Sequence, residues 1–182
     1  MKVLSVNISG PKPLTYRGQT VMTGIFKTPV AGRVRIRKLG LEDDVQVDRR
    51  VHGGPDKAVY MYPHEHYAHW EKLLSRKDFA FGQFGENLTT SGLLEDDVRV
   101  GDTLRVGSTL LQVTQPRQPC SKLMTKMNNF HFAEPFLESG RTGFYLRVLE
   151  EGEVGAGDVI ERVATDPATP TIREVVQESI NQ

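Results

Sequence analysis

The residue of this chain best suited to chemistry is its only cysteine, Cys120, which ends the run Gln115-Pro116-Arg117-Gln118-Pro119-Cys120. Each proline fixes φ and removes a backbone donor, so the peptide that leads to the sulfur has few conformations. Arg117 adds a positive charge that would favour the thiolate, the form that attacks electrophiles and binds metals. A free cysteine is also among the most often buried residue types. The run therefore leaves two interpretations open, a small core residue and a stiffly presented reactive sulfur.

The cysteine count limits the metal chemistry that Cys120 could perform. A structural zinc site needs four ligands and an iron–sulfur cluster needs several thiolates, and one cysteine supplies neither. Soft thiolates do bind soft or thiophilic metals. We expect Cys120 to be either the single protein ligand of a metal held mainly by an organic cofactor, or a nucleophile or sulfur carrier.

A second chemically suggestive segment is residues 48–59, where glycines stand among basic side chains. Gly53 and Gly54 let successive backbone N–H groups point into one concavity, an arrangement that binds anions. The charged or titratable residues of the segment are Asp48, Arg49, Arg50, His52, Asp56 and Lys57. A hairpin with solvated charges is the alternative, and the pattern does not decide between the two.

Two further groups of polar residues carry weaker signals. Glu86 and Asn87 could offer acceptors and amide donors to the edge of a heterocycle, or they could cap a turn. His64, His66 and His69 lack the His-Glu-x-x-His spacing of a zinc site. We expect these histidines on the solvent-facing side of an amphipathic helix.

The elements that must position these residues are mainly short β-like runs. Gly-rich or Asx-rich breaks separate them, which favours a mainly β protein, a barrel or a sandwich, over alternating strands and helices. The expected strands are 3–8, 20–26, 33–37, 45–47, 58–62, 87–90, 103–106, 110–113, 144–149 and 158–163.

Few helices are expected. Residues 63–74 fit a helix best, with Pro63 in the first turn and apolar residues at helical spacing. Shorter helices are expected at 121–127 and within 130–139.

The last part of the chain has a different pattern. Residues 166–170 are typical of a linker, and apolar residues at helical spacing predict an amphipathic helix over 171–180. We therefore expect one main domain, residues 1–165, followed by a linker and a C-terminal helix, residues 166–182.

Composition narrows the functional classes. Lys plus Arg and Asp plus Glu both total 23, so the formal net charge is zero and no basic field would gather nucleic acid or anionic lipid. No apolar run approaches the roughly 20 residues of a membrane-spanning helix, and the alternating N-terminus lacks the apolar stretch of a signal peptide. With a single cysteine, these features predict a protein of the reducing cytoplasm that binds neither nucleic acid nor membrane.

Taken together, the motifs resemble those of a MOSC domain, the module named after the C-terminal domain of molybdenum-cofactor sulfurases, and above all its stand-alone bacterial YiiM-like branch. The likeness spans about residues 1–165, and its specificity lies in the order of the motifs. The residues that carry it are Asp48, 52–60, 62–63, 67–70, 84–88, 101–102, 115–120 and 140–148.

The resemblance implies a β-barrel with a few peripheral helices that binds a pyranopterin molybdenum cofactor, with Cys120 as the protein ligand to molybdenum. The implied activity is reduction of N-hydroxylated small molecules, hydroxylaminopurine-type base analogues among them, and hence their detoxification. Because no flavin-binding or iron–sulfur signature is present, a separate reductase would supply the electrons.

The same resemblance, combined with the residue types, assigns expected roles within the site. The expected catalytic residues are Cys120 and, as proton donor, His52 or Asp56. The residues expected to bind the cofactor are Arg49, Arg50, His52, Gly53, Gly54, Lys57, Glu86, Asn87, Arg117 and Arg141.

Two features depart from the family pattern. The YiiM-like pattern usually continues into a small three-helix domain, whereas a single helix is expected here before Gln182. Residues 166–182 could therefore be the remnant of that domain, and a docking surface for the electron donor could be missing. Ser121 stands where an aromatic residue often follows the cysteine, which would open the metal pocket to water.

Other functions would use the same sulfur. Cys120 could form a persulfide and hand sulfur to a metal centre, or the domain could bind the cofactor without turnover. The sequence separates these alternatives from a reductase poorly. It also leaves the physiological substrate and the oligomeric state open, a homodimer included.

Overall fold

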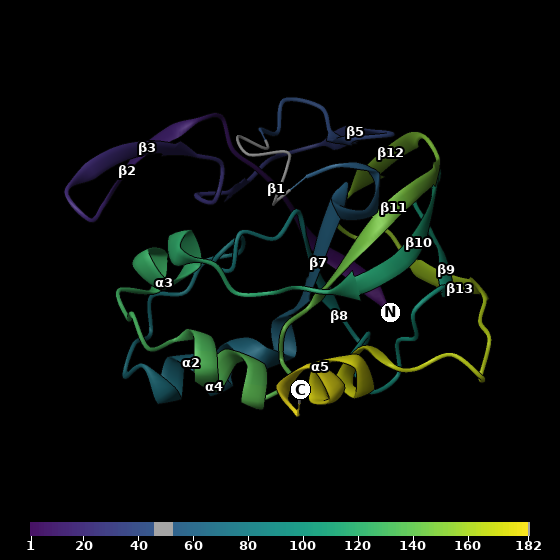
Figure 1. Ribbon diagram of the computed structural model, residues 1–182. Helices are drawn as coiled ribbons and strands as arrows, with labels where there is room; N and C mark the ends of the chain where they lie inside the picture. Colours follow the sequence, from purple (N-terminus) through teal and green to yellow (C-terminus); the bar gives the residue numbers. More distant parts are fainter. Residues whose placement is uncertain (46–52, 182) are drawn as a thin grey trace.

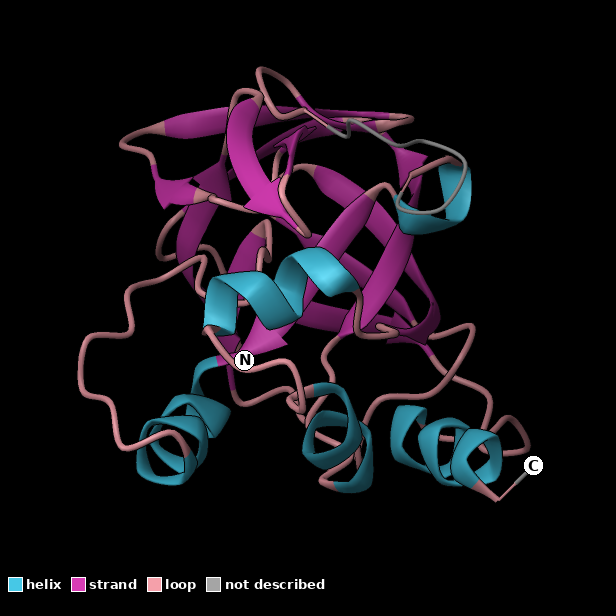
Figure 2. Cartoon of the chain, turned by 60° about the vertical axis from the view of Figure 1, so that its left-hand side comes forward, coloured by secondary structure: helices cyan, strands magenta, loops and turns pink. Residues whose placement is uncertain are grey.

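The computed structural model describes residues 1–45 and 53–181 and is mainly β with a few short helices, as expected. Its strands gather on one side of the molecule, and most of its helices lie on the other (Figures 1 and 2). Among the described residues, no helix is long and apolar enough to cross a bilayer.

One eight-stranded sheet forms the body of the fold, in the order β13-β9-β10-β11-β7-β8-β1-β4. All neighbours in it are antiparallel except β7 and β8. Its strands are β1 (Lys2–Ile8), β4 (Thr28–Pro29), β7 (Val59–Pro63), β8 (Leu88–Ser91), β9 (Thr103–Val106), β10 (Thr109–Pro116), β11 (Phe144–Glu150) and β13 (Ile160–Ala164).

The expected closure of this sheet into a barrel is not supported. Within residues 1–45 and 53–181 the sheet ends at β13 and β4, and no β-ladder joins these two edges. An isolated bridge between Lys2 and Val159 and a few backbone hydrogen bonds connect β1 to the start of β13. The reason lies in β1, whose outer edge pairs partly with the turn before β13 and partly with the two-residue strand β4. No continuous ladder forms there, so the sheet curls without closing.

Two smaller sheets complete the β structure. The first has the order β12-β5-β6, and the second is the hairpin β2-β3, which stands beside the main sheet above α3 (Figure 1). Their strands are β2 (Lys12–Tyr16), β3 (Gln19–Thr23), β5 (Arg33–Arg37), β6 (Gly40–Leu41) and β12 (Gly152–Gly155).

The helices are short and mostly where the sequence predicts them. The predicted helix at 121–127 is confirmed as α3 (Ser121–Met127). The helix predicted over 63–74 begins one residue later, because Pro63 still belongs to β7, and it divides into two helices. The remaining helices are η1 (Pro55–Lys57), η2 (His64–His66), α2 (Tyr67–Leu73), α4 (Ala133–Glu138) and α5 (Ile172–Ile180).

Strand β7 divides the interior into two cores because its side chains alternate between its two faces. Val59 and Met61 belong to an aliphatic core within the main sheet, whereas Tyr60 and Tyr62 belong to an aromatic core between the sheet and the helices. The aromatic core includes Trp70, Phe84, Phe132 and Phe136. This alternation places the ring of Tyr60 beside the site described below.

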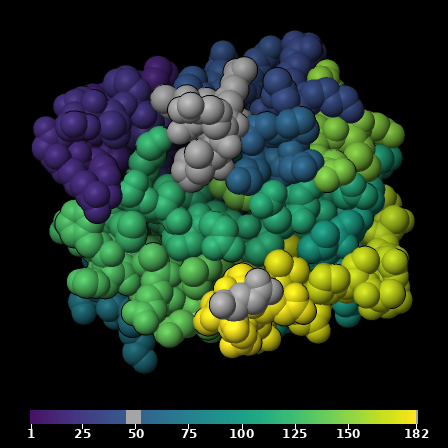
Figure 3. All heavy atoms as spheres, viewed as in Figure 1, coloured from purple at the N-terminus to yellow at the C-terminus, as the bar shows by residue number. Residues whose placement is uncertain are grey.

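The C-terminal helix packs against the main body. Ile172 is part of the aliphatic core, Val176 is also buried, and the preceding Pro170 accepts a hydrogen bond from the Val100 backbone. In the space-filling view the C-terminal segment lies directly against the rest of the molecule (Figure 3). The end of the expected linker and the helix that follows it are thus in contact with the main domain.

Candidate functional site

A cavity opens beside Cys120, where the segment after β3 approaches β7, β11 and the loop that follows β10. Its lining includes that cysteine and four basic residues, Lys27, Lys57, Arg117 and Lys122. No aspartate or glutamate is among the described residues that line it. A concave surface with one sign of charge favours an anionic ligand.

Cys120 lies at the end of the stiff loop after β10 and directly precedes α3. Its backbone is extended, and its carbonyl oxygen accepts a hydrogen bond of 3.1 Å from the Met124 amide. The residue is half-buried and contacts the edge of the aromatic core, yet it also lines the cavity and an adjoining hollow along residues 115–121. The sulfur is therefore presented to a cavity, which favours the reactive interpretation over the core interpretation.

Arg117 places its guanidinium against this sulfur. Only 5% of its surface is exposed, and its Nη2 lies 3.7 Å from Cys120 Sγ. Its Nη1 donates to the Tyr145 hydroxyl at 3.2 Å, and its guanidinium stands 4.9 Å from the centre of the Tyr60 ring. Two tyrosines thus fix the guanidinium in place beside the thiol.

The charge on Arg117 is retained despite its burial. Burial acts to lower the pKa of Arg117, but the acidic groups nearby, Tyr145 first, then Tyr60 and Cys120, outweigh it and hold the pKa above its ordinary value. A fixed positive charge at this distance stabilises a thiolate. Arg117 Nε is buried and has no hydrogen-bond partner among the described residues.

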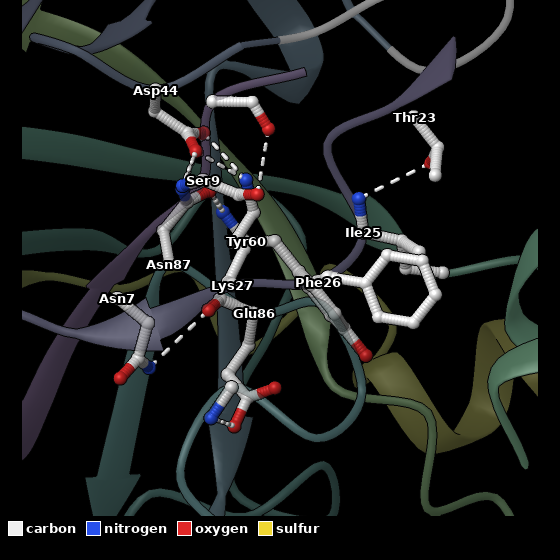
Figure 4. A network of polar contacts seen from close by, with 12 residues as sticks. Asn7, Ser9, Thr23, Ile25, Phe26, Lys27, Asp44, Tyr60, Glu86 and Asn87 are labelled. Atoms are coloured by element: carbon white, nitrogen blue, oxygen red, sulfur yellow. Dashed lines mark hydrogen bonds and ion pairs between the residues drawn. The ribbon is translucent and has the colours of Figure 1, made fainter. Parts of the chain in front are cut away.

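Lys27 lines another part of the cavity and belongs to a buried polar network (Figure 4). Its Nζ lies 2.5 and 2.6 Å from the two carboxylate oxygens of Asp44. Asp44 also accepts hydrogen bonds from the Ser9 amide and from Asn87 Nδ2, each at 2.9 Å. Burial lowers the pKa of Lys27, although Asp44 acts in the opposite direction. Neither member of this ion pair is among the residues that the sequence predicts for the site.

The predicted pair Glu86 and Asn87 divides between two tasks. Glu86 is fully buried and does not line the cavity; its carboxyl group accepts hydrogen bonds from the Gly82 and Phe84 amides at 3.0 and 2.9 Å. The hydroxyls of Tyr67 and Thr89 also donate to it. Glu86 thereby fixes the turn that carries the next residues of the site.

Asn87 does line the cavity, but the protein already uses its side-chain amide. Its Oδ1 accepts a hydrogen bond from the Tyr60 amide at 3.1 Å, while its Nδ2 donates to Asp44. The neighbouring Gly85 has a φ of +80°, and a Cβ added there would lie 2.9 Å from Ile25 Cγ1. A side chain at this position would therefore crowd the cavity wall.

The predicted anion-binding segment is only partly described. Arg49, Arg50 and His52 lie outside the described residues, so their predicted roles stay predictions. Gly54 has a φ of +92° and precedes η1, which brings Lys57 to the cavity.

Two other predicted residues lie away from the cavity lining. Asp56 is exposed and pairs with Arg147 at 2.9 Å. Arg141 lies near His69. The pKa of His69 is lowered mainly by its partial burial and secondly by the charge of Arg141. Neither Asp56 nor Arg141 lines the cavity beside Cys120.

The expectation that all three histidines face solvent is wrong for His66. This side chain is buried, and its Nε2 lies 2.6 Å from Glu95 Oε2. Glu95 Oε1 accepts a hydrogen bond from the Gly143 amide at 2.7 Å, so the pair ties η2 to the start of β11. The register changes at Tyr67, where η2 gives way to α2, and a single helical wheel does not predict that change. No group of three or more His, Cys, Asp or Glu residues in the described parts of the chain could hold a metal.

The sequence and the fold match a known class of proteins. A family model described as the MOSC domain matches residues 48–161, and the chain belongs to the MOSC domain family. It is similar to the uncharacterized protein YflK of Bacillus subtilis (strain 168), at 46% identity over 159 residues, 87% of this chain and 72% of that protein. It is also similar to Protein YiiM of Escherichia coli (strain K12), at 40% identity over 149 residues, 78% of this chain and 64% of that protein.

The fold agrees with that of a solved relative. The crystal structure of YiiM from Geobacillus stearothermophilus superposes with a TM-score of 0.81 at 38% identity, over 98% of this chain and 83% of that chain. A protein of Gibberella moniliformis (strain M3125 / FGSC 7600) named "Reductase" is 32% identical over 146 residues, 79% of this chain and 26% of that protein. The YiiM-like assignment made from the ordered motifs is thus confirmed.

Proposed function

We propose that this protein binds a pyranopterin molybdenum cofactor in the cavity beside Cys120 and reduces N-hydroxylated small molecules with electrons from a separate reductase. The observation that carries the proposal is the placement of one half-buried thiol, with Arg117 against it, in a cavity whose described charged side chains are all cations. Membership of the MOSC family and the relative named "Reductase" support the same class of activity.

The residues present fit such a cofactor. One thiol suits a metal whose other ligands come from an organic group. The basic lining suits the phosphate of that group, and Arg117 Nε is a buried donor without a partner among the described residues, which costs free energy unless a ligand accepts from it. We assign the metal to Cys120 and the anionic part of the cofactor to Lys57 and Arg117, with Asn87 at the cavity wall.

When bound, the cofactor supplies two-electron chemistry at a metal next to the sulfur. The chain's own residues prepare that place: Arg117 stabilises the thiolate, and Tyr60 and Tyr145 hold Arg117. The overall change is R–NHOH + 2e⁻ + 2H⁺ → R–NH₂ + H₂O. Substrates of the hydroxylaminopurine type would make the protein a detoxifying enzyme of the cytoplasm.

Turnover by cofactor-loaded protein tests the proposal. Protein from cofactor-competent cells is given an artificial electron donor and either a hydroxylaminopurine or a simple hydroxylamine. We expect the amine product with wild type and none with Cys120→Ser. Fully loaded wild type without turnover would contradict a reductase. A cyanide-labile sulfur on molybdenum-free protein would instead favour the sulfur carrier.

A further inference from the structure

Reduction of an N–O bond consumes two protons. Neither of the two predicted proton donors, Asp56 and His52, is among the described residues that line the cavity. Asp56 lies on the surface in its ion pair with Arg147, and His52 lies outside the described residues. The remaining candidates for the proton donor are the titratable side chains that line the cavity.

Several of these side chains are poorly suited to release a proton. Arg117 keeps its charge, because guanidinium does not deprotonate in proteins. Burial raises the pKa of Tyr60 well above its usual range, and its hydroxyl donates to the Thr142 carbonyl at 2.8 Å. Lys57 and Lys122 are half-exposed, whereas delivery of a proton inside the cavity calls for a side chain buried at its wall.

Lys27 differs from these groups in its geometry. Its side chain is 8% exposed, yet it lines the same cavity as Cys120. Two of its N–H groups are directed to the two oxygens of Asp44. An ammonium has three N–H groups, and the third has no acceptor among the described residues. Figure 4 shows Lys27 and Asp44 side by side in this network.

We propose that Lys27 is the acid that delivers a proton into the cavity during the reaction. This inference rests on the proposed function. Asp44 holds the ammonium of Lys27 at the cavity wall. The proton of the third N–H group is transferred to the substrate oxygen as the N–O bond breaks. In R–NHOH + 2e⁻ + 2H⁺ → R–NH₂ + H₂O, Lys27 supplies one proton, solvent supplies the other, and the reductase supplies both electrons. Lys27 is left as a neutral amine beside Asp44, and a proton from solvent restores it.

The charges that face Lys27 are balanced so that the proton can leave. Burial is the largest influence and disfavours the ammonium, and Arg117 and Lys126 add repulsion. Asp44 and Glu86 act in the opposite direction. The net result is a pKa below the ordinary lysine value, which brings the acid closer to the working pH.

The first test measures Lys27 without relying on activity. Cofactor-free protein is labelled with ¹³C-lysine, and NMR follows the Cε chemical shift of Lys27 against pH. The signal is assigned by through-bond correlation to the backbone. We expect its midpoint below the roughly 10.4 of an unperturbed lysine, and lower still in Asp44→Asn, which removes the opposing anion. A midpoint at or above the ordinary value would overturn the proposal.

The second test uses loaded enzyme and a charge-retaining variant. Lys27→Arg keeps the positive charge but cannot release its proton, so kcat should fall about 100-fold or more while molybdenum content and KM stay near wild type. The control, Lys72→Arg, makes the same change on the exposed face of α2 and should behave as wild type. Absence of activity in the loaded wild type would refute the proposed function. Full activity in Lys27→Arg would refute only the role of Lys27 and would leave the proposed function standing.

The pH profile separates proton donation from a structural role. In wild type, kcat should fall at high pH with a midpoint that matches the titration of Lys27 in the loaded enzyme. Lys27→Gln, checked for folding by thermal melting, should lose this limb, whereas Tyr145→Phe should retain it. A wild-type limb that does not match Lys27, or a limb that Tyr145→Phe removes, would overturn the assignment even if both Lys27 variants fold poorly.

Discussion

Arg117 and Glu86 are both buried charges, but they serve the site in different ways. Arg117 contacts the sulfur and two tyrosines, and it retains an unused donor. Glu86 lies outside the cavity lining, where backbone amides and hydroxyls satisfy its carboxyl group. Each residue belongs to a short sequence motif, yet only the three-dimensional contacts distinguish the cavity-lining charge from the supporting one.

Removal of Arg117 should make Cys120 less reactive. Arg117→Met keeps much of the packing but loses the charge, so the thiolate fraction at neutral pH should fall about tenfold. Because Cys120 is the only cysteine, the rate of alkylation by iodoacetamide in cofactor-free protein measures this directly. Arg105→Met, a change to an exposed arginine, should leave the rate unchanged. An unchanged rate in Arg117→Met would refute the electrostatic role.

Replacement of Glu86 should destabilise the fold. Glu86→Gln preserves the size but removes the charge and places an N–H₂ group among hydrogen-bond donors. We expect a loss of about 2 kcal/mol in the free energy of unfolding, measured by urea denaturation. Glu178→Gln makes the same change on an exposed side chain and should cost little. Equal stability of the two variants would contradict the supporting role of Glu86.

At the scale of elements, hydrophobic periodicity predicts those helices and strands whose bounds depend on local sequence alone. Helix α3 and strand β9 match their predicted bounds, because apolar spacing and flanking breaks are local signals. Strand β12 is not among the predicted strands, since glycine is typical of turns. Gly152 is instead needed because a Cβ there would lie 2.6 Å from the Ser108 carbonyl oxygen of the neighbouring hairpin. That contact lies 44 residues away and has no local signal.

The start of α5 offers a test of an element's own contribution. Thr171 Oγ1 accepts from the Glu174 amide at 3.1 Å, and Glu174 accepts from the Thr171 amide at 2.7 Å, which forms a capping box. Thr171→Ala should lower the free energy of unfolding by about 1 kcal/mol. Gln177→Ala, on the exposed face of the same helix, should not lower it. If α5 were an independent appendage, Thr171→Ala would leave the main unfolding transition unchanged.

At the scale of the whole molecule, the site depends on segments that meet only after folding. Cys120 and Arg117 share one run, and the sequence predicted their proximity. Lys27 and Asp44 are 17 residues apart and come together only where the segment between β3 and β4 meets the chain that follows β6. Their residue types carry no signal by themselves, so the ion pair could not be predicted. The same is true of His66 and Glu95, which join the helical side to β11.

Buried lysines should also give the whole protein a distinctive pH dependence. Burial lowers the pKa of Lys126 to about 8, where its Nζ donates to the Ile25 and Gly82 carbonyls. Between this value and the roughly 10.4 of the unfolded chain, the unfolded state binds more protons, so stability rises with pH. From pH 7 to 9.5 Lys126 should contribute a gain of about 2 kcal/mol.

Urea denaturation of cofactor-free protein at pH 7, 8.5 and 9.5 measures this gain. Lys126→Met should show a correspondingly smaller rise in the free energy of unfolding than wild type. The thiol and the other titratable groups are common to both proteins, so their effects cancel in the comparison. Parallel curves for the two proteins would show that burial does not lower the pKa of Lys126.

The central claim is that the sulfur of Cys120 holds a molybdenum centre, and the molybdenum content of purified protein tests it most directly. Wild type and Cys120→Ser are produced side by side in cofactor-competent cells, and metal and protein are quantified in folded samples. The site described here predicts near-stoichiometric molybdenum in wild type and its loss in Cys120→Ser. Equal molybdenum in the two proteins, or none in either, would contradict it.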